Sequence, residues 1–132
     1  MYVSRVCNFL GALVFGIVVV AIFCLWPSVA NAEDSVSFSE DIFPIIQIRC
    51  LKCHHPGGEG YEKSGFDLRT YESLMKGTEF GPMVIPGDPF MSNLNVLIEG
   101  RSAMSMPLHG KKLTTCDRDL FYKWVKQGAL NN

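Results

Sequence analysis

The sequence predicts a small all-α domain preceded by an apolar N-terminal helix. Its 132 residues leave room for one domain once an export segment is set aside. Beyond residue 32, apolar residues recur at helical intervals near both ends of the remaining region, and little of it has the alternation of a strand. The connecting segments are rich in glycine and proline, which indicates long loops between few regular elements.

Residues 1–32 have the form of a secretory signal peptide. Arg5 precedes an apolar run over residues 9–26, and Ala30 and Ala32 supply the small side chains that a signal peptidase requires. The same run is just long enough to span a bilayer, so an uncleaved membrane anchor is the alternative. In both cases we expect the rest of the chain to be exported to the periplasm or a comparable oxidising compartment, soluble or tethered by residues 9–26.

Residues 33–37 are expected to form a short polar tether, and residues 38–130 the folded domain. From Phe38 onwards, apolar residues recur at steps of three and four, which predicts a helix leading into a pair of cysteines. The positions are Ile42, Ile45, Ile46, Cys50 and Cys53. Because proline is tolerated only in the first turn of a helix, Pro44 limits where this helix starts. After it, Pro56–Gly60 predicts a break in regular structure.

Two short helices and a turn are expected in the middle of the domain. Thr70 can cap a helix over Tyr71–Lys76. Ser92 can cap another over Asn93–Glu99, and a glycine directly follows each of the two. Between them, Pro86–Pro89 has the composition of a turn.

The last helix has the strongest signal. Thr114 is followed three residues later by Asp117, which is close to the capping-box pattern. An apolar stripe then runs to Gly128 and consists of Leu120, Phe121, Trp124 and Val125.

Charge and cysteine content argue against two classes of protein. Beyond residue 32 there are thirteen acidic and eleven basic residues and no basic stripe, so binding to nucleic acid is not expected. Of the five cysteines, Cys7 and Cys24 fall in the leader, which leaves Cys50, Cys53 and Cys116. An odd number argues against a scaffold held together by disulfides alone.

Cys50-Leu51-Lys52-Cys53-His54 forms a C-x-x-C-H motif, the attachment sequence of c-type haem. At about 100° per residue, the two cysteines and the histidine would share one face of the expected helix. Two thiols placed in this way can add to the two vinyl groups of one porphyrin, while the imidazole reaches the iron. The motif therefore predicts one haem c, attached through two thioethers at Cys50 and Cys53, with His54 as an iron ligand.

Two other uses of the motif have less support. A redox-active disulfide of this spacing usually opens a helix within a βαβ unit, and that pattern is missing from the sequence. Zinc bound by the two thiols and by His54 or His55 would need further ligands at a suitable spacing. Only Cys116 and His109 remain for that purpose.

The second axial position of the iron decides what such a domain can do. A methionine there raises the reduction potential, whereas an empty position permits ligand binding or activation. The region beyond residue 32 offers Met75, Met83, Met91, Met104 and Met106, together with His55 and His109. We expect Met106, because Pro107 stiffens the loop that presents it. Met104 and then His109 are the alternatives. The other three methionines are expected to fill the core, and His55 to lie at the surface or behind a ligand.

Further short segments beside the motif narrow the family. They are Pro44-Ile45-Ile46, Ser64-Gly65-Phe66-Asp67-Leu68, Pro86-Gly87-Asp88-Pro89 with Ser92 and Leu94, Met106-Pro107 with Gly110 and Leu113, and Trp124-Val125-Lys126-Gln127-Gly128-Ala129. Together with the motif they resemble the planctomycete-type cytochrome c domains, a branch of the small monohaem cytochromes c, from about Phe38 to Ala129. The resemblance implies a cytochrome c-like fold wrapped around one haem, anchored at Cys50 and Cys53. It also implies His54 as the proximal ligand and Met106 as the distal ligand.

The sequence departs from the family pattern at three positions. Leu108 stands where a second proline is common, His55 where a small or polar residue is usual, and Cys116 lies in the first turn of the last helix. Cys116 could pair with a partner chain, although a lone cysteine near a helix start is more often a small, partly buried residue.

Trp124 is expected to pack on the haem or on the first helix. Candidates to bind the haem propionates are Arg49, Lys52, Arg69, Arg101 and Tyr71.

We therefore expect an exported monohaem c-type cytochrome that passes single electrons between larger redox proteins through a His/Met-ligated iron. Such a carrier makes and breaks no substrate bond, so it is not an enzyme, and its docking is weak and transient. One alternative is a haem-bearing subunit of a membrane or periplasmic oxidoreductase complex, in contact with the membrane only if the leader is uncleaved. Another is a haem enzyme or gas-binding protein with an open sixth site.

Overall fold

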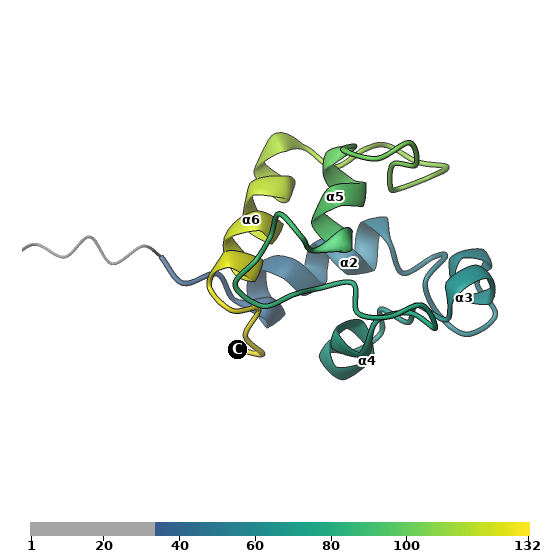
Figure 1. Cartoon of the computed structure of the whole chain (residues 1–132), viewed down its shortest axis with the longest axis horizontal. Helices are drawn as coiled ribbons and strands as arrows, with labels where there is room; N and C mark the ends of the chain where they lie inside the picture. Colours follow the sequence, from purple (N-terminus) through teal and green to yellow (C-terminus); the bar gives the residue numbers. More distant parts are fainter. Residues whose placement is uncertain (1–33) are drawn as a thin grey trace, which may run out of the picture. The chain divides into compact units, whose positions relative to one another are not determined.

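Helices and loops make up the part of the chain that the structure, a computed structural model, describes, residues 34–132 (Figure 1). In chain order the elements are η1 (Phe38–Ile42), α2 (Phe43–Arg49), α3 (Glu59–Ser64), α4 (Tyr71–Lys76), α5 (Asn93–Glu99) and α6 (Thr115–Lys126). Within residues 34–132 there is no strand, only an isolated bridge between Thr78 and Gly81, and the predicted all-α class is confirmed. No helix of this region has the length and apolar character needed to cross a bilayer. The predicted signal or anchor segment and Glu33 lie outside the described residues.

The first predicted helix begins as a π-helical turn. Ser37 caps η1 by accepting from the N–H of Glu40, and Phe43 N–H then donates to Phe38 O, five residues back. In regular α-geometry the ring of Pro44 would collide with the carbonyl of Glu40, and the wider π spacing relieves that contact. As expected, Pro44 falls in the first turn of α2.

Three of the predicted helices have the expected bounds. Thr70 and Thr114 each form a capping box at the start of α4 and α6, which confirms both cap assignments. Helix α5 also covers the predicted residues, but Ser92 does not cap it with its side chain. Instead Ser92 is fully buried, accepts from Ile85 N–H and donates to Asp88 O at 2.7 Å, which fastens the predicted turn to the helix.

Helix α3 was not predicted. Its N-cap, Gly58, provides no side-chain hydrogen bond, and the helix contains a second glycine, Gly60. On composition alone, both glycines indicate a break in regular structure. The helix ends at Gly65, which adopts the left-handed conformation at φ 67°. None of the α3 residues is buried in the core.

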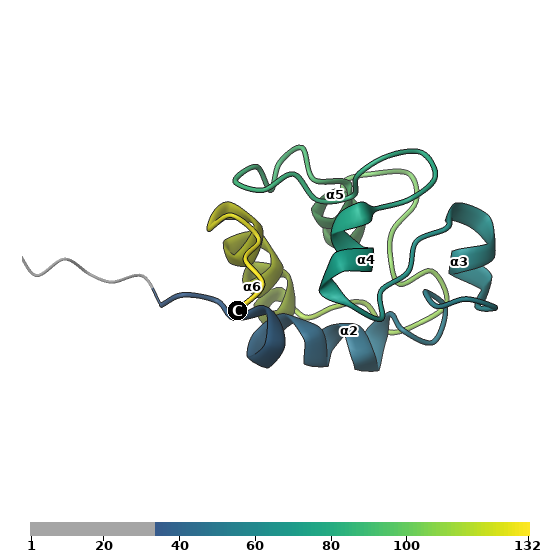
Figure 2. The ribbon, with the colours of Figure 1, turned by 90° about the horizontal axis from the view of Figure 1, so that it is seen from below.

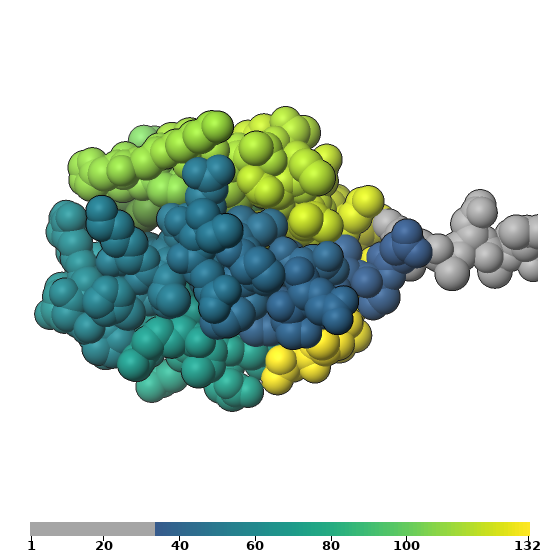
Figure 3. Space-filling model, turned by 180° about the vertical axis from the view of Figure 1, so that it is seen from behind, coloured from purple at the N-terminus to yellow at the C-terminus, as the bar shows by residue number. Residues whose placement is uncertain are grey.

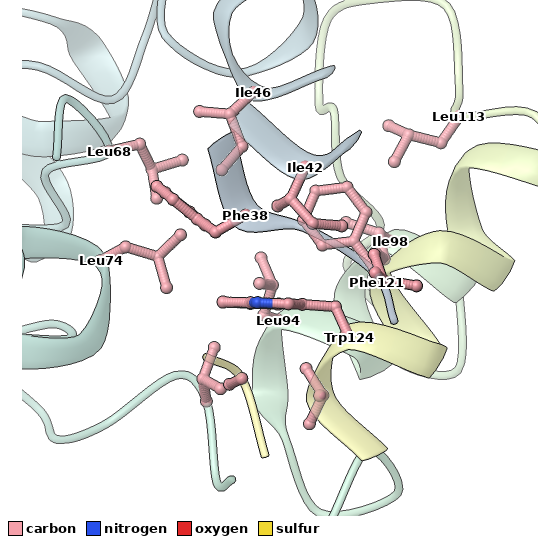
Figure 4. Close-up of a cluster of buried hydrophobic side chains, with 14 of the residues drawn as sticks. Phe38, Ile42, Ile46, Leu68, Leu74, Leu94, Ile98, Leu113, Phe121 and Trp124 are labelled. Atoms are coloured by element: carbon pink, nitrogen blue, oxygen red, sulfur yellow. The ribbon is translucent and has the colours of Figure 1, made fainter. Parts of the chain in front are cut away.

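The hydrophobic core lies where η1, α5 and α6 meet, and side chains from α2 and α4 complete it (Figure 4). Trp124 is fully buried at its centre, with its ring 5.6 Å from that of Phe38. Its indole N–H donates to Leu130 O at 2.9 Å. The predicted stripe on α6 is therefore confirmed, and Trp124 packs on the first helical segment. In the turned view of Figure 2, α3 lies at the opposite end of the described region from α6.

Candidate functional site

A cavity of about 720 Å³ lies between the segment after α2, helix α3, helix α5 and the loop of residues 100–114. Its wall is mostly apolar, and its size is typical of small-molecule and cofactor sites. Cys50, Cys53 and His54 line it together with Met104, Met106 and His109. On the face shown in Figure 3, the green part of this loop lies against the blue segment that contains α2. The cavity thus brings together every residue that the sequence singled out for the iron and the thioethers.

The C-x-x-C-H motif lies in turns after α2 and not on the helix itself. The helix ends at Arg49, and Cys50 already has a non-helical φ of −122°. The expectation of one continuous helical face through Cys53 was wrong in this respect. One hydrogen bond with α-helical spacing is still present: His54 N–H donates to Cys50 O, four residues back, at 3.1 Å. The chain leaves the helix here because the next segment must fold back towards α3, where Tyr61 N–H donates to Cys53 O.

The segment after α3 holds the imidazole of His54. Its Nδ1 lies 3.3 Å from Phe66 O, and a carbonyl can only accept, so Nδ1 carries the proton and Nε2 keeps a free lone pair. The ring also meets Phe66 edge to face, with centroids 5.5 Å apart, and Leu68 N–H donates to His54 O. Burial lowers the pKa of His54, although the hydrogen bond to Phe66 opposes this shift. A neutral imidazole oriented by a backbone carbonyl is the usual arrangement of a metal-binding histidine.

Gly60 allows α3 to pack directly on this imidazole. A Cβ at position 60 would lie 2.8 Å from Cε1 of His54 and 3.0 Å from each ring nitrogen. At position 58 a Cβ would lie 2.6 Å from Cys53 O, so that glycine is also needed for close approach. The two glycines that concealed α3 in the sequence are therefore the residues that bring it against the motif.

The two thiols of the motif are free and half-buried. Burial raises the pKa of Cys50 to about 11; Arg49 lowers it, and Cys53 raises it further. Redox-active dithiols need a thiol with a lowered pKa, so this environment is unfavourable for disulfide exchange. Among residues 34–132, no three His, Cys, Asp or Glu side chains are grouped so that they could hold a metal ion.

Met106 is the half-buried methionine on the loop side of the cavity. Its N–H donates to Leu97 O of α5 at 2.9 Å, and its side chain packs against the core. Met104 also lines the cavity but is 47% exposed, and His109 is exposed. Met83 lines the cavity while packing on the core, so it is a further thioether near the site that the sequence placed only in the core.

The outcomes at the remaining methionines and at His55 are mixed. Met75 packs against the core as expected. Met91 is 66% exposed, so its assignment to the core was wrong; it belongs to an exposed loop instead. His55 is half-buried, does not line the cavity, and has its Nδ1 2.8 Å from Pro56 O.

The structure separates the five candidates for the haem propionates. Arg49 and Lys52 line the cavity. Arg69 and Arg101 do not, and they form ion pairs with Asp67 and Glu99. The hydroxyl of Tyr71 donates to Ala129 O at 2.8 Å. Two lysines that the sequence did not single out, Lys63 and Lys111, also line the cavity, and only the fold shows that they face it.

Cys116 is exposed in the first turn of α6 and has no disulfide partner among residues 34–132. The expectation that it would be partly buried was wrong, because the buried stripe of α6 starts further along the helix. Trp124 does not line the cavity, so its role is in the core.

Comparison with known families agrees with the geometry of this site. Residues 50–108 match the family model described as Planctomycete cytochrome C. No curated protein and no solved structure matches the chain. The matched segment starts at the first cysteine of the motif and contains both the carbonyl that orients His54 and the Met106-Pro107 pair. Residues 50–108 are therefore similar to planctomycete-type cytochrome c domains, and this similarity suggests haem binding and electron transfer as the general role.

Proposed function

We propose that this chain is an exported monohaem cytochrome that carries single electrons between larger redox proteins. The proposal depends on one observation: the thiols of Cys50 and Cys53, the neutral imidazole of His54 and the half-buried thioether of Met106 all line one cavity. Haem c would supply a one-electron Fe(II)/Fe(III) couple there. Export follows from the signal-like segment and agrees with the usual location of cytochrome c domains.

Cys50 and Cys53 would hold the cofactor covalently. Each S–H would add across one vinyl C=C of the haem, with a C–S bond formed, the hydrogen placed on the neighbouring carbon and no oxidant needed. Both sulfurs must be free thiols beforehand, and both are. The polypeptide has only to present them from the turn that follows α2.

His54 and Met106 would be the side chains that hold the iron. The protonated Nδ1 stays on Phe66 O, so the lone pair of Nε2 is the donor to the metal. The Met106 sulfur would favour the ferrous state and so raise the reduction potential. Held by the same two side chains in both oxidation states, the iron would supply electron transfer with little change in structure. That is the property of a carrier, and it leaves no open position for a substrate.

An absorption spectrum and one matched pair of variants test this assignment. The purified haem-loaded protein should be low-spin in both oxidation states and should bind carbon monoxide only slowly when reduced. Met106→Ala should lower the reduction potential, give a high-spin ferric form and bind carbon monoxide promptly. Met104→Ala changes a more exposed methionine of the same loop and should leave the spectrum and the potential as in the wild type.

A high-spin wild-type protein that binds carbon monoxide at once would instead indicate the enzyme or gas-binding alternative. If Met104→Ala and not Met106→Ala opened the site, the distal ligand would be Met104. Mass spectrometry of the mature chain would show whether haem is covalently bound, from the added mass, and whether the leader is cleaved near Ala32. A partner that co-purifies stoichiometrically would favour the subunit of an oxidoreductase complex over the free carrier.

A further inference from the structure

The loop of residues 100–114 presents Met106 with little help from regular structure. It joins α5 to α6 without a helix or strand of its own, and connections of this length are uncommon unless they are functional. Among the described residues, its segment 102–113 makes one backbone–backbone hydrogen bond, from Met106 N–H to Leu97 O. Residues 101–104 and 108–112 are exposed. Something besides the backbone must therefore hold the loop in shape.

Lys112 supplies that support. Its ammonium group donates to Ser105 O at 2.8 Å and to Pro107 O at 2.7 Å. These two carbonyls belong to the residues immediately before and after Met106. Lys112 itself does not line the cavity, whereas its neighbour Lys111 does. The ammonium thus reaches the loop from outside the cavity and leaves the thioether side free.

We propose that Lys112 is the positioning residue of the distal ligand: it closes the loop around Met106 and limits how often the sulfur leaves the iron. The inference rests on the proposed role of Met106. Because an ammonium has three donors and no acceptor, one side chain can bind both carbonyls at once. The contacts to Ser105 and Pro107 also replace water on backbone groups that no helix satisfies.

The test measures how often the site opens. Carbon monoxide can bind the ferrous protein only when the distal position is vacant, so its observed binding rate reports the open fraction. Lys112→Met removes both hydrogen bonds and keeps the aliphatic stem. With two charge-assisted but exposed bonds lost, we expect binding to become about tenfold faster. Hydrogen exchange at Met106 N–H should accelerate by a similar factor, which reports loop opening independently of the iron.

Two further variants separate positioning from charge and from folding. Lys112→Arg can still donate to both carbonyls and should stay close to the wild type. Lys123→Met removes the same charge from an exposed site on α6 and should change neither rate. Unchanged rates in Lys112→Met, or equal acceleration in Lys112→Met and Lys123→Met, would overturn the proposal. Prompt carbon monoxide binding by the wild type, with no effect of Met106→Ala, would instead reject Met106 as ligand and leave the role of Lys112 without a basis.

Discussion

Replacing Gly60 with alanine tests whether α3 is built around the imidazole of His54. In an ordinary helix interior this change stabilises a protein by about 1 kcal/mol, because alanine has the higher helix propensity. Here the added Cβ would lie 2.8 Å from Cε1 of His54 and 3.0 Å from both ring nitrogens. Overpacking of that kind costs about 1–3 kcal/mol. Contacts this short correspond to the upper part of that range, about 2–3 kcal/mol, so after subtracting the gain of about 1 kcal/mol we expect a net loss of about 1–2 kcal/mol.

The assay is thermal unfolding of the haem-loaded protein, followed by the absorbance of the haem and by circular dichroism. For a domain of about 100 residues, each kcal/mol corresponds to a change in Tm of about 4–8 °C. Gly60→Ala should therefore unfold about 4–16 °C below the wild type. Gly110→Ala is the control, because a Cβ there meets only Pro107 at 3.6 Å, an ordinary contact. Its Tm should stay within about 2–4 °C of the wild type.

The loss should be smaller in the haem-free chain. There the ring of His54 can swing away from the new methyl group at the cost of its weak hydrogen bond to Phe66 O. An imidazole bound to iron has no such freedom. A higher Tm for Gly60→Ala in the loaded protein, as helix propensity alone would give, would refute the close packing of α3 on His54.

Two further predictions concern pH and the last helix. Burial lowers the pKa of His54 in the haem-free chain, so the unfolded state binds the proton more readily, and the free energy of unfolding should fall as pH drops through about 6.5. Urea denaturation at about pH 7.5 and about pH 5.5 measures this, and a difference that persists in His54→Asn would contradict the assignment. Thr114→Ala removes the cap of α6 and should cost about 1 kcal/mol, while Thr115→Ala, next to it, should cost less. Equal losses in the two variants would rule out the capping box as the cause.

Local patterns in the sequence were sufficient for the elements whose signals are local. The caps at Thr70 and Thr114, the stops at Gly77 and Gly100 and the stripe on α6 all act within a few residues, and the structure contains them as expected. The end of α2 was misplaced because periodicity cannot show where a chain must fold back. Helix α3 was missed because Gly58 and Gly60 are poor helix formers. They are needed there for close contact with Cys53 and His54, which a pattern of helix propensity does not reveal.

For the site, residue type and spacing identified the motif, and the cavity brings the predicted residues together. The contacts that support these residues could not be predicted from the sequence. Phe66 acts through its carbonyl, which every residue type possesses, so no side-chain pattern could reveal it. Lys112 differs from Lys111 only in which side of a loop it faces. Among the propionate candidates, only the fold shows that Arg69 and Arg101 do not line the cavity and that they pair with Asp67 and Glu99.

The core surrounds Trp124 at one end of the domain, whereas no residue of α3 is buried. This difference has a consequence for how the protein matures. The half built from η1, α5 and α6 is held together by its own side chains, whereas α3 and the long loop line the cavity. If a haem fills this cavity as proposed, order in that second half should come late, when the haem is bound. Until then, α3 and the loop should be the segments most open to proteolysis, so haem-free chains would be degraded faster than haem-loaded ones.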